Sequence, residues 1–66
     1  MQLTINGKSK IFPQQLTVEQ LLAQLQLSPT QVVIELNHDI VFTADHSQTE
    51  LKTGDQVEIV HFVGGG

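Results

Sequence analysis

The N-terminal residues have the pattern of two short strands joined by a tight turn. Apolar and polar residues alternate over 1–5, which is the period of a strand with one buried face. A second short extended segment, 9–12, follows the pair Asn6-Gly7. These two residue types accept the positive φ that both central positions of a type I′ turn require. The pattern therefore predicts a β-hairpin.

A helix is predicted to begin at Thr17, its N-cap residue. Its hydroxyl can accept a hydrogen bond from the backbone N–H of Gln20, whose side chain can reach back to Thr17, so the pair is typical of a capping box. The apolar residues that follow recur at i, i+3, i+4 and i+7: Val18, Leu21, Leu22 and Leu25. We expect this helix to end at Ser28-Pro29, because a residue before proline disfavours the helical conformation.

Three more extended segments follow the helix. Strands are predicted over 32–37, 40–42 and 56–63, separated by turn residues at 37–39 and 53–55. The polar stretch 43–53 is expected to be a loop with one short helical turn that ends near Leu51. The order of strands and helix predicts an α+β fold in which the helix covers one face of the sheet.

Side-chain parity divides the last strand into two faces. Glu58 lies on the same face as Val60 and Phe62, and we expect this face to be the solvent side because Glu is rarely fully buried. Glu35 likewise lies on the same face as Val33 on an earlier strand, so we expect Val33 to point to solvent as well. Val60, Phe62 and Val33 are therefore predicted to form an exposed apolar surface for a partner. Two alternatives stay open: scattered apolar residues of the kind common on surfaces, and a face that a loop covers.

The composition narrows the class of protein. The chain of 66 residues is expected to form one domain over 1–63, followed by a flexible glycine tail at 64–66. The net charge of −4 disfavours contact with nucleic-acid phosphates, and it suits either an ordinary solvated surface or attraction to a basic partner. There is no Cys, no signal-peptide pattern and no apolar run of the roughly 20 residues that a membrane span needs. We therefore expect a cytoplasmic domain that binds neither nucleic acid nor membrane.

The histidines are the candidates for side-chain chemistry: His38, His46 and His61. None has metal-ligand spacing with another. His38 and His46 are expected to be solvated in turns, and His61 to be a partly buried structural residue near the sheet edge. The sequence therefore predicts no catalytic residue and no metal site.

The chain ends in Gly64-Gly65-Gly66. Glycine lacks Cβ and permits close approach of the backbone, so such a tail can pass through a narrow channel. Gly64 and Gly65 would then present the carboxylate of Gly66 to the active site of another protein. The alternatives are a merely flexible end and a remnant of an expression vector.

Several motifs support a resemblance to a known family. They are Val33-Ile34-Glu35-Leu36-Asn37, Ile40-Val41, Leu51, Gly54-Asp55-Gln56-Val57-Glu58-Ile59-Val60 and Phe62-Val63-Gly64-Gly65-Gly66. With these motifs, its length, its hairpin and its helix start, the chain resembles the thiamine-biosynthesis sulfur carrier proteins over essentially its whole length. The resemblance implies a ubiquitin-like β-grasp fold, a mixed sheet of four to five strands covered on one face by one main helix.

Two positions depart from the family pattern. His38 stands where a small residue, often Gly, commonly follows the Asn of the turn. Phe42-Thr43 stands where a Pro and a basic residue often follow the Ile-Val pair. These departures leave the partner contacts of this loop open, but they do not touch the glycine tail.

The resemblance also implies a chemistry for the tail. An E1-like adenylating enzyme would use ATP to convert the Gly66 carboxylate to an acyl-adenylate, and a sulfurtransferase system would replace AMP with sulfur. The resulting thiocarboxylate would supply thiazole synthase with the sulfur of the thiamine thiazole ring. The chain would then be a protein co-substrate and not an enzyme, with no bound cofactor.

Alternative functions remain at this point. The same tail chemistry serves molybdopterin synthesis and tRNA thiolation, and an activated tail also suits a protein-conjugating modifier. A stand-alone regulatory or RNA-binding β-grasp module shares several of the motifs, although it needs no free glycine end and its RNA target does not favour an acidic chain.

Overall fold

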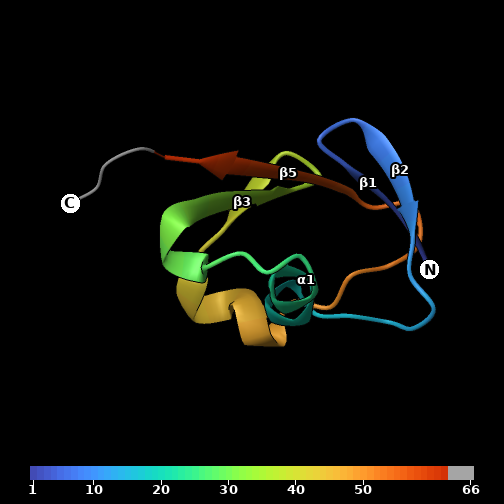
Figure 1. Cartoon of the computed structure of the whole chain (residues 1–66), viewed down its shortest axis with the longest axis horizontal. Coiled ribbons are helices and arrows are strands. Elements are labelled where there is room, and N and C mark those ends of the chain that lie inside the picture. Colours follow the sequence, from blue (N-terminus) through green and yellow to red (C-terminus); the bar gives the residue numbers. More distant parts are fainter. Residues whose placement is uncertain (63–66) are drawn as a thin grey trace.

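The computed structural model of the chain describes residues 1–62, so Val63 and the predicted glycine tail 64–66 lie outside the described residues. The elements follow in the order β1 (Gln2–Ile5), β2 (Lys8–Ile11), α1 (Val18–Gln24), η1 (Pro29–Gln31), β3 (Val32–Leu36), β4 (Asp39–Val41), η2 (Thr43–Gln48) and β5 (Gln56–His61), where η is a 3-10 helix. The strands form one five-stranded sheet in the order β2-β1-β5-β3-β4. β1 pairs with β5 in parallel and the other neighbours are antiparallel, so the sheet is mixed. The α+β prediction is confirmed, with α1 lying across one face of the sheet (Figure 1).

Two tight turns connect the antiparallel hairpins. The turn between β1 and β2 has φ of 49° at Asn6 and 81° at Gly7, and the turn between β3 and β4 has φ of 51° at Asn37 and 76° at His38. Both turns therefore have the two positive φ values that a type I′ turn requires. The predicted N-terminal hairpin is confirmed, and the second turn has the same conformation without a glycine.

The start of α1 agrees with the sequence. The Gln20 N–H donates to Thr17 Oγ1 at 3.2 Å, and the Thr17 N–H donates to Gln20 Oε1 at 2.9 Å, which completes the capping box. The apolar stripe of α1 then lies against the sheet, with Val18, Leu21 and Leu22 buried. The predicted cap and buried face of the helix are confirmed.

The predicted end of the helix, at the Ser-Pro pair, is wrong. α1 ends at Gln24, because Gln26 takes the left-handed conformation with φ of 60°. The Leu27 N–H then donates to the Leu22 carbonyl at 2.9 Å, which is the 6→1 hydrogen bond of a Schellman motif. Pro29 begins the short helix η1 instead, where its missing N–H costs nothing.

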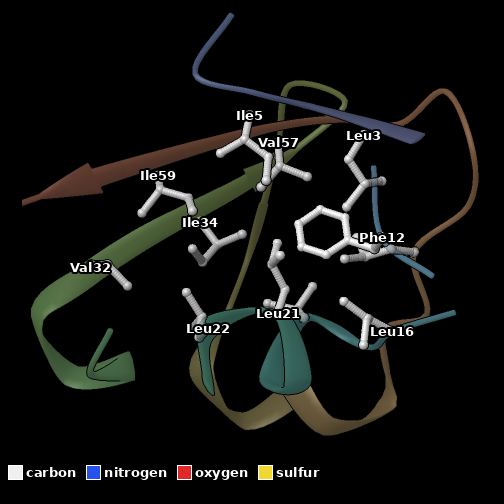
Figure 2. Packing of buried hydrophobic residues seen from close by; sticks show 12 residues of the cluster. Leu3, Ile5, Phe12, Leu16, Leu21, Leu22, Val32, Ile34, Val57 and Ile59 are labelled. Atoms are coloured by element: carbon white, nitrogen blue, oxygen red, sulfur yellow. The ribbon is translucent and has the colours of Figure 1, made fainter. Parts of the chain in front are cut away.

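The core lies between the inner face of the sheet and the layer formed by α1 and η2. Figure 2 shows its apolar side chains pointing toward one another from the strands, from α1 and from the segments beside them. The members are Leu3, Ile5, Phe12, Leu16, Val18, Leu21, Leu22, Val32, Ile34, Leu51, Val57 and Ile59. A chain of this length depends on such a core, since it buries only about 60% of its unfolded surface.

The stretch 43–53 holds more structure than expected. η2 is six residues long and ends before Leu51, which is fully buried. On η2, His46 is only 4% exposed and its Nε2 lies 3.2 Å from the carbonyl oxygen of Val41. The expectation of a solvated His46 is therefore wrong, because η2 packs against α1 and completes the layer below the sheet (Figure 1).

The expectation for His61 is also wrong. Its parity does match that of the buried Ile59, but the side chain is exposed. The C-terminal end of β5 extends beyond α1, so the helical layer does not cover it (Figure 1). His38 is exposed, as predicted for a turn.

Candidate docking face beside the glycine tail

The outer face of the sheet, on the side away from α1, carries an ordered set of side chains. Val33 pairs with Val60 and Glu35 with Glu58 between β3 and β5. Between β3 and β4, Glu35 pairs with Ile40. Residues directly across a pair of strands point to the same face. The two rows, one apolar and one with two carboxylates, are therefore adjacent on the outer face.

Exposure identifies the apolar part of this face. Val60 and Phe62 are each 51% exposed, Ile40 is 55% exposed and Phe42 is 68% exposed. Val33 lies half-buried between its neighbours. We call these five residues the outer patch. The predicted exposure of Val60 and Phe62 is confirmed, which removes the alternative of a covering loop within the described residues.

The sequence analysis did not predict that Ile40 and Phe42 belong to this exposed apolar surface. The signal for Ile40 is the two-residue turn between β3 and β4, because that turn places Ile40 across from Glu35 and hence on the outer face. Phe42 follows β4 in an extended conformation, with φ of −71° and ψ of 151°. Its side chain therefore falls on the same side as Ile40, while Val41 packs against the core.

Asparagine side chains from the two turns hold β5 in place. Asn6 Oδ1 accepts from the Ile59 N–H at 2.7 Å, and Asn6 Nδ2 donates to the Ile59 carbonyl at 3.2 Å. Asn37 Oδ1 accepts from the Gln56 N–H at 2.9 Å, while Asn37 Nδ2 donates to Asp55 at 3.1 Å. With β1 on one side and β3 on the other, β5 is a central strand, and its C-terminal end is held by its pairing with β3.

The predicted sulfur-carrying residue Gly66 and the presenting residues Gly64 and Gly65 lie outside the described residues. The last described residue, Phe62, is still tied to the domain, because its N–H donates to the carbonyl of Gln31 at 3.3 Å. Phe62 also belongs to the outer patch. The exposed apolar surface thus lies directly beside the point where the chain continues toward its glycines.

Small hollows also lie in the described part. One, of about 210 Å³, lies on the helical side, is lined by Leu22, Ala23, Leu27 and neighbouring residues, and is smaller than the roughly 300–1,000 Å³ of typical ligand pockets. Another, of about 310 Å³, is wide open to solvent and mostly polar, with Gln15 and Lys52 among its lining residues, so it lacks the enclosed apolar walls of a ligand pocket. Within residues 1–62, no three His, Asp or Glu side chains lie close enough together to hold a metal ion. No helix in the same range is long and apolar enough to cross a membrane.

A mixed five-stranded sheet with one main helix across its inner face, in this order of elements, defines a ubiquitin-like β-grasp domain. The model of the ThiS family matches residues 2–66. A crystal structure of the thiamine biosynthesis protein ThiS from Geobacter metallireducens superposes with a TM-score of 0.87, at 36% identity and with 100% of both chains covered. The chain belongs to the ThiS family.

Curated relatives give two kinds of match. The chain is 40% identical over 65 residues to the sulfur carrier protein ThiS of Bacillus subtilis (strain 168), which covers 97% of this chain and 98% of that protein. It is 41% identical over 66 residues to a thiazole synthase of Paramagnetospirillum magneticum and 35% identical to one of Magnetococcus marinus. Both of these matches cover all of this chain and span 20% of the longer protein.

Proposed function

We propose that this protein is a sulfur carrier for synthesis of the thiamine thiazole ring, with sulfur bound at the carboxyl of Gly66. The observation that carries the proposal is the family match over residues 2–66, because it includes the glycine tail as well as the folded domain. The Bacillus subtilis relative, matched over nearly its whole length, has the name of a sulfur carrier. Two further relatives have the name of the proposed sulfur acceptor, thiazole synthase.

The proposed chemistry first gives the Gly66 carboxyl a good leaving group. A carboxylate is a poor acyl donor, so activation comes first: a Gly66 carboxylate oxygen attacks the α-phosphorus of ATP on an E1-like adenylating enzyme, and pyrophosphate leaves. A persulfide sulfur of a sulfurtransferase system then attacks the carbonyl carbon of the acyl-adenylate, AMP leaves, and a second thiol of that system cleaves the S–S bond of the resulting acyl disulfide and is left in a disulfide. The product is a thiocarboxylate, from which thiazole synthase takes the sulfur.

The protein acts in this scheme as a co-substrate. Its own side chains supply docking and positioning, whereas ATP binding and bond making belong to the partners, and the chain holds no cofactor. The outer patch (Val33, Ile40, Phe42, Val60 and Phe62) packs against the surface of a partner. The hydrogen bonds that hold β5 in the sheet fix the point from which the tail begins. Gly64 and Gly65 lack Cβ atoms and so fit a narrow channel that leads to the partner's active site. Use of ATP places the proposed reaction in the cytoplasm.

The test is the mass of the C-terminal peptide. The full chain is incubated with ATP, the adenylating enzyme, a sulfurtransferase and a sulfur source, and is then digested and analysed by mass spectrometry. The expected result is a mass gain equal to replacement of one oxygen by sulfur, confined to the peptide that contains Gly66. A chain lacking Gly65 and Gly66 is the control and shows no gain. An unchanged mass of the full chain would contradict the proposal.

A further inference from the structure

Two glutamates are cross-strand neighbours on the sheet's outer face. Glu35 of β3 lies directly across from Glu58 of β5. Like charges in this position destabilise a pair of strands. The lysines lie elsewhere, with Lys8 and Lys10 on β2, two strands away from β5, and Lys52 in the loop before β5. Two like charges therefore lie on adjacent strands with no lysine on β3, β4 or β5 to offset them.

The acidic pair has apolar neighbours on two sides and the polar Gln56 beside Glu58 on another. Ile40 lies across from Glu35 on the other side, and the next row along the strands pairs Val33 with Val60. Ile40 and Val60 are each about half exposed, at 55% and 51%. A contiguous exposed apolar surface on a small domain marks an interaction site. The acidic pair is therefore part of the docking face, and any partner that covers the outer patch also covers the two carboxylates.

A second copy of this chain is a poor occupant of this face. A two-fold dimer brings the same patch of both chains together, so residues near the axis meet their own counterparts. Here that contact would crowd four carboxylates into one desolvated interface, which is costly without opposite charges. The acidic pair thus discourages the self-association to which an exposed apolar sheet face is otherwise prone.

Building on the proposed function, we propose that Glu35 and Glu58 select a protein partner that presents an arginine side chain set among apolar residues. The guanidinium group is planar and carries five donors, so one arginine can bind both carboxylates, and it is less strongly hydrated than the ammonium group of lysine. The net charge of −4 also favours encounter with a basic surface. The apolar residues of the outer patch then exclude water around the ion pairs.

The experiment compares two double variants of the full chain with matched charge. Glu35→Gln/Glu58→Gln removes the acidic pair, and Glu19→Gln/Glu50→Gln removes two exposed carboxylates outside the outer face, on α1 and in the loop after η2. One arm measures KM for each chain in pyrophosphate release by the adenylating enzyme at low and high salt. The other arm measures self-association by sedimentation velocity over a range of concentrations.

In the enzymatic arm, the KM of Glu35→Gln/Glu58→Gln should rise by about tenfold at low salt with a weaker salt dependence, while the control stays near the wild type. In the sedimentation arm, the same variant should self-associate where the wild type and the control stay monomeric. The proposal is overturned if Glu35→Gln/Glu58→Gln has the same KM as Glu19→Gln/Glu50→Gln, or if it stays monomeric as that control does. If the wild type itself releases no pyrophosphate, the proposed function fails, and the sedimentation arm alone then decides the role of the acidic pair.

Discussion

The two faces of the sheet are made by the same strands and differ in what covers them. On the inner face of β5, Val57 and Ile59 are 1% and 6% exposed, whereas on the outer face Val60 and Phe62 are each 51% exposed. Burying such a side chain fully stabilises the fold by about 1.5–3 kcal/mol. The inner residues obtain nearly all of this from α1 and the core, and the outer residues obtain about half of it. The inner face therefore carries the larger share of the stability, and the outer face is left exposed for the proposed recognition of a partner.

The largest expected effect on stability is at Leu51, which is fully buried under the sheet. Leu51→Ala should lower the free energy of unfolding by about 2–5 kcal/mol, because it removes apolar contacts and leaves a cavity. Urea denaturation followed by circular dichroism measures the loss. If the variant does not fold, Ile34→Val is the milder test, with an expected loss of about 0.5–1.5 kcal/mol. Losses below the measurement error at both sites would contradict the assigned core.

A smaller effect is expected where α1 begins. Thr17→Ala removes the hydroxyl that accepts from the Gln20 N–H and should lower the free energy of unfolding by about 1 kcal/mol. Thr17→Ser keeps the acceptor and serves as the matched control. Equal stability of the Ala and Ser variants would show that the capping box does not support the layer over the inner face.

The two type I′ turns provide a finer comparison. Gly7 has φ of 81° without strain, whereas His38 holds φ of 76° with a Cβ atom. His38→Gly should raise the free energy of unfolding by about 0.5–1 kcal/mol, with the relief of strain partly offset by the greater freedom of Gly in the unfolded chain. Thermal unfolding measures the gain. A loss of stability would show that the imidazole makes a compensating contact.

The smallest effect on stability is expected on the outer face. Val60→Thr should change the free energy of unfolding by no more than about 0.5 kcal/mol, because it keeps the β-branched shape and the side chain is already half solvated. The same variant should raise KM with the adenylating enzyme by at least about tenfold, since central apolar contacts dominate interface energies. Strong destabilisation with an unchanged KM would reverse the assignment of the two faces.

Local chemistry explains what could be predicted from the sequence. The Asn6-Gly7 turn, the Thr17 cap and the parity of Val60 and Phe62 each depend on residues close together in the chain. The structure confirms all three. The family resemblance, which depends on motifs along the whole chain, is likewise confirmed.

Most of the features that were missed depend on contacts between distant segments. His46 is buried because η2 packs on α1, and His61 is exposed because β5 extends past that helix. The pairing of Glu35 with Glu58 arises from the long-range register of β3 and β5, which no local pattern specifies. The helix end at Gln24 depends on a left-handed Gln26, a conformation that few non-glycine residues adopt.

In the proposed function, sulfur travels on Gly66 to the thiazole ring. The direct measurement uses a chain loaded with isotopically heavy sulfur, purified away from the loading enzymes and mixed with thiazole synthase and its small-molecule substrates. We predict that the heavy isotope appears in the thiazole product while the C-terminal peptide returns to its original mass. A labelled chain that retains its sulfur, with an unlabelled or absent thiazole product, would contradict the assignment.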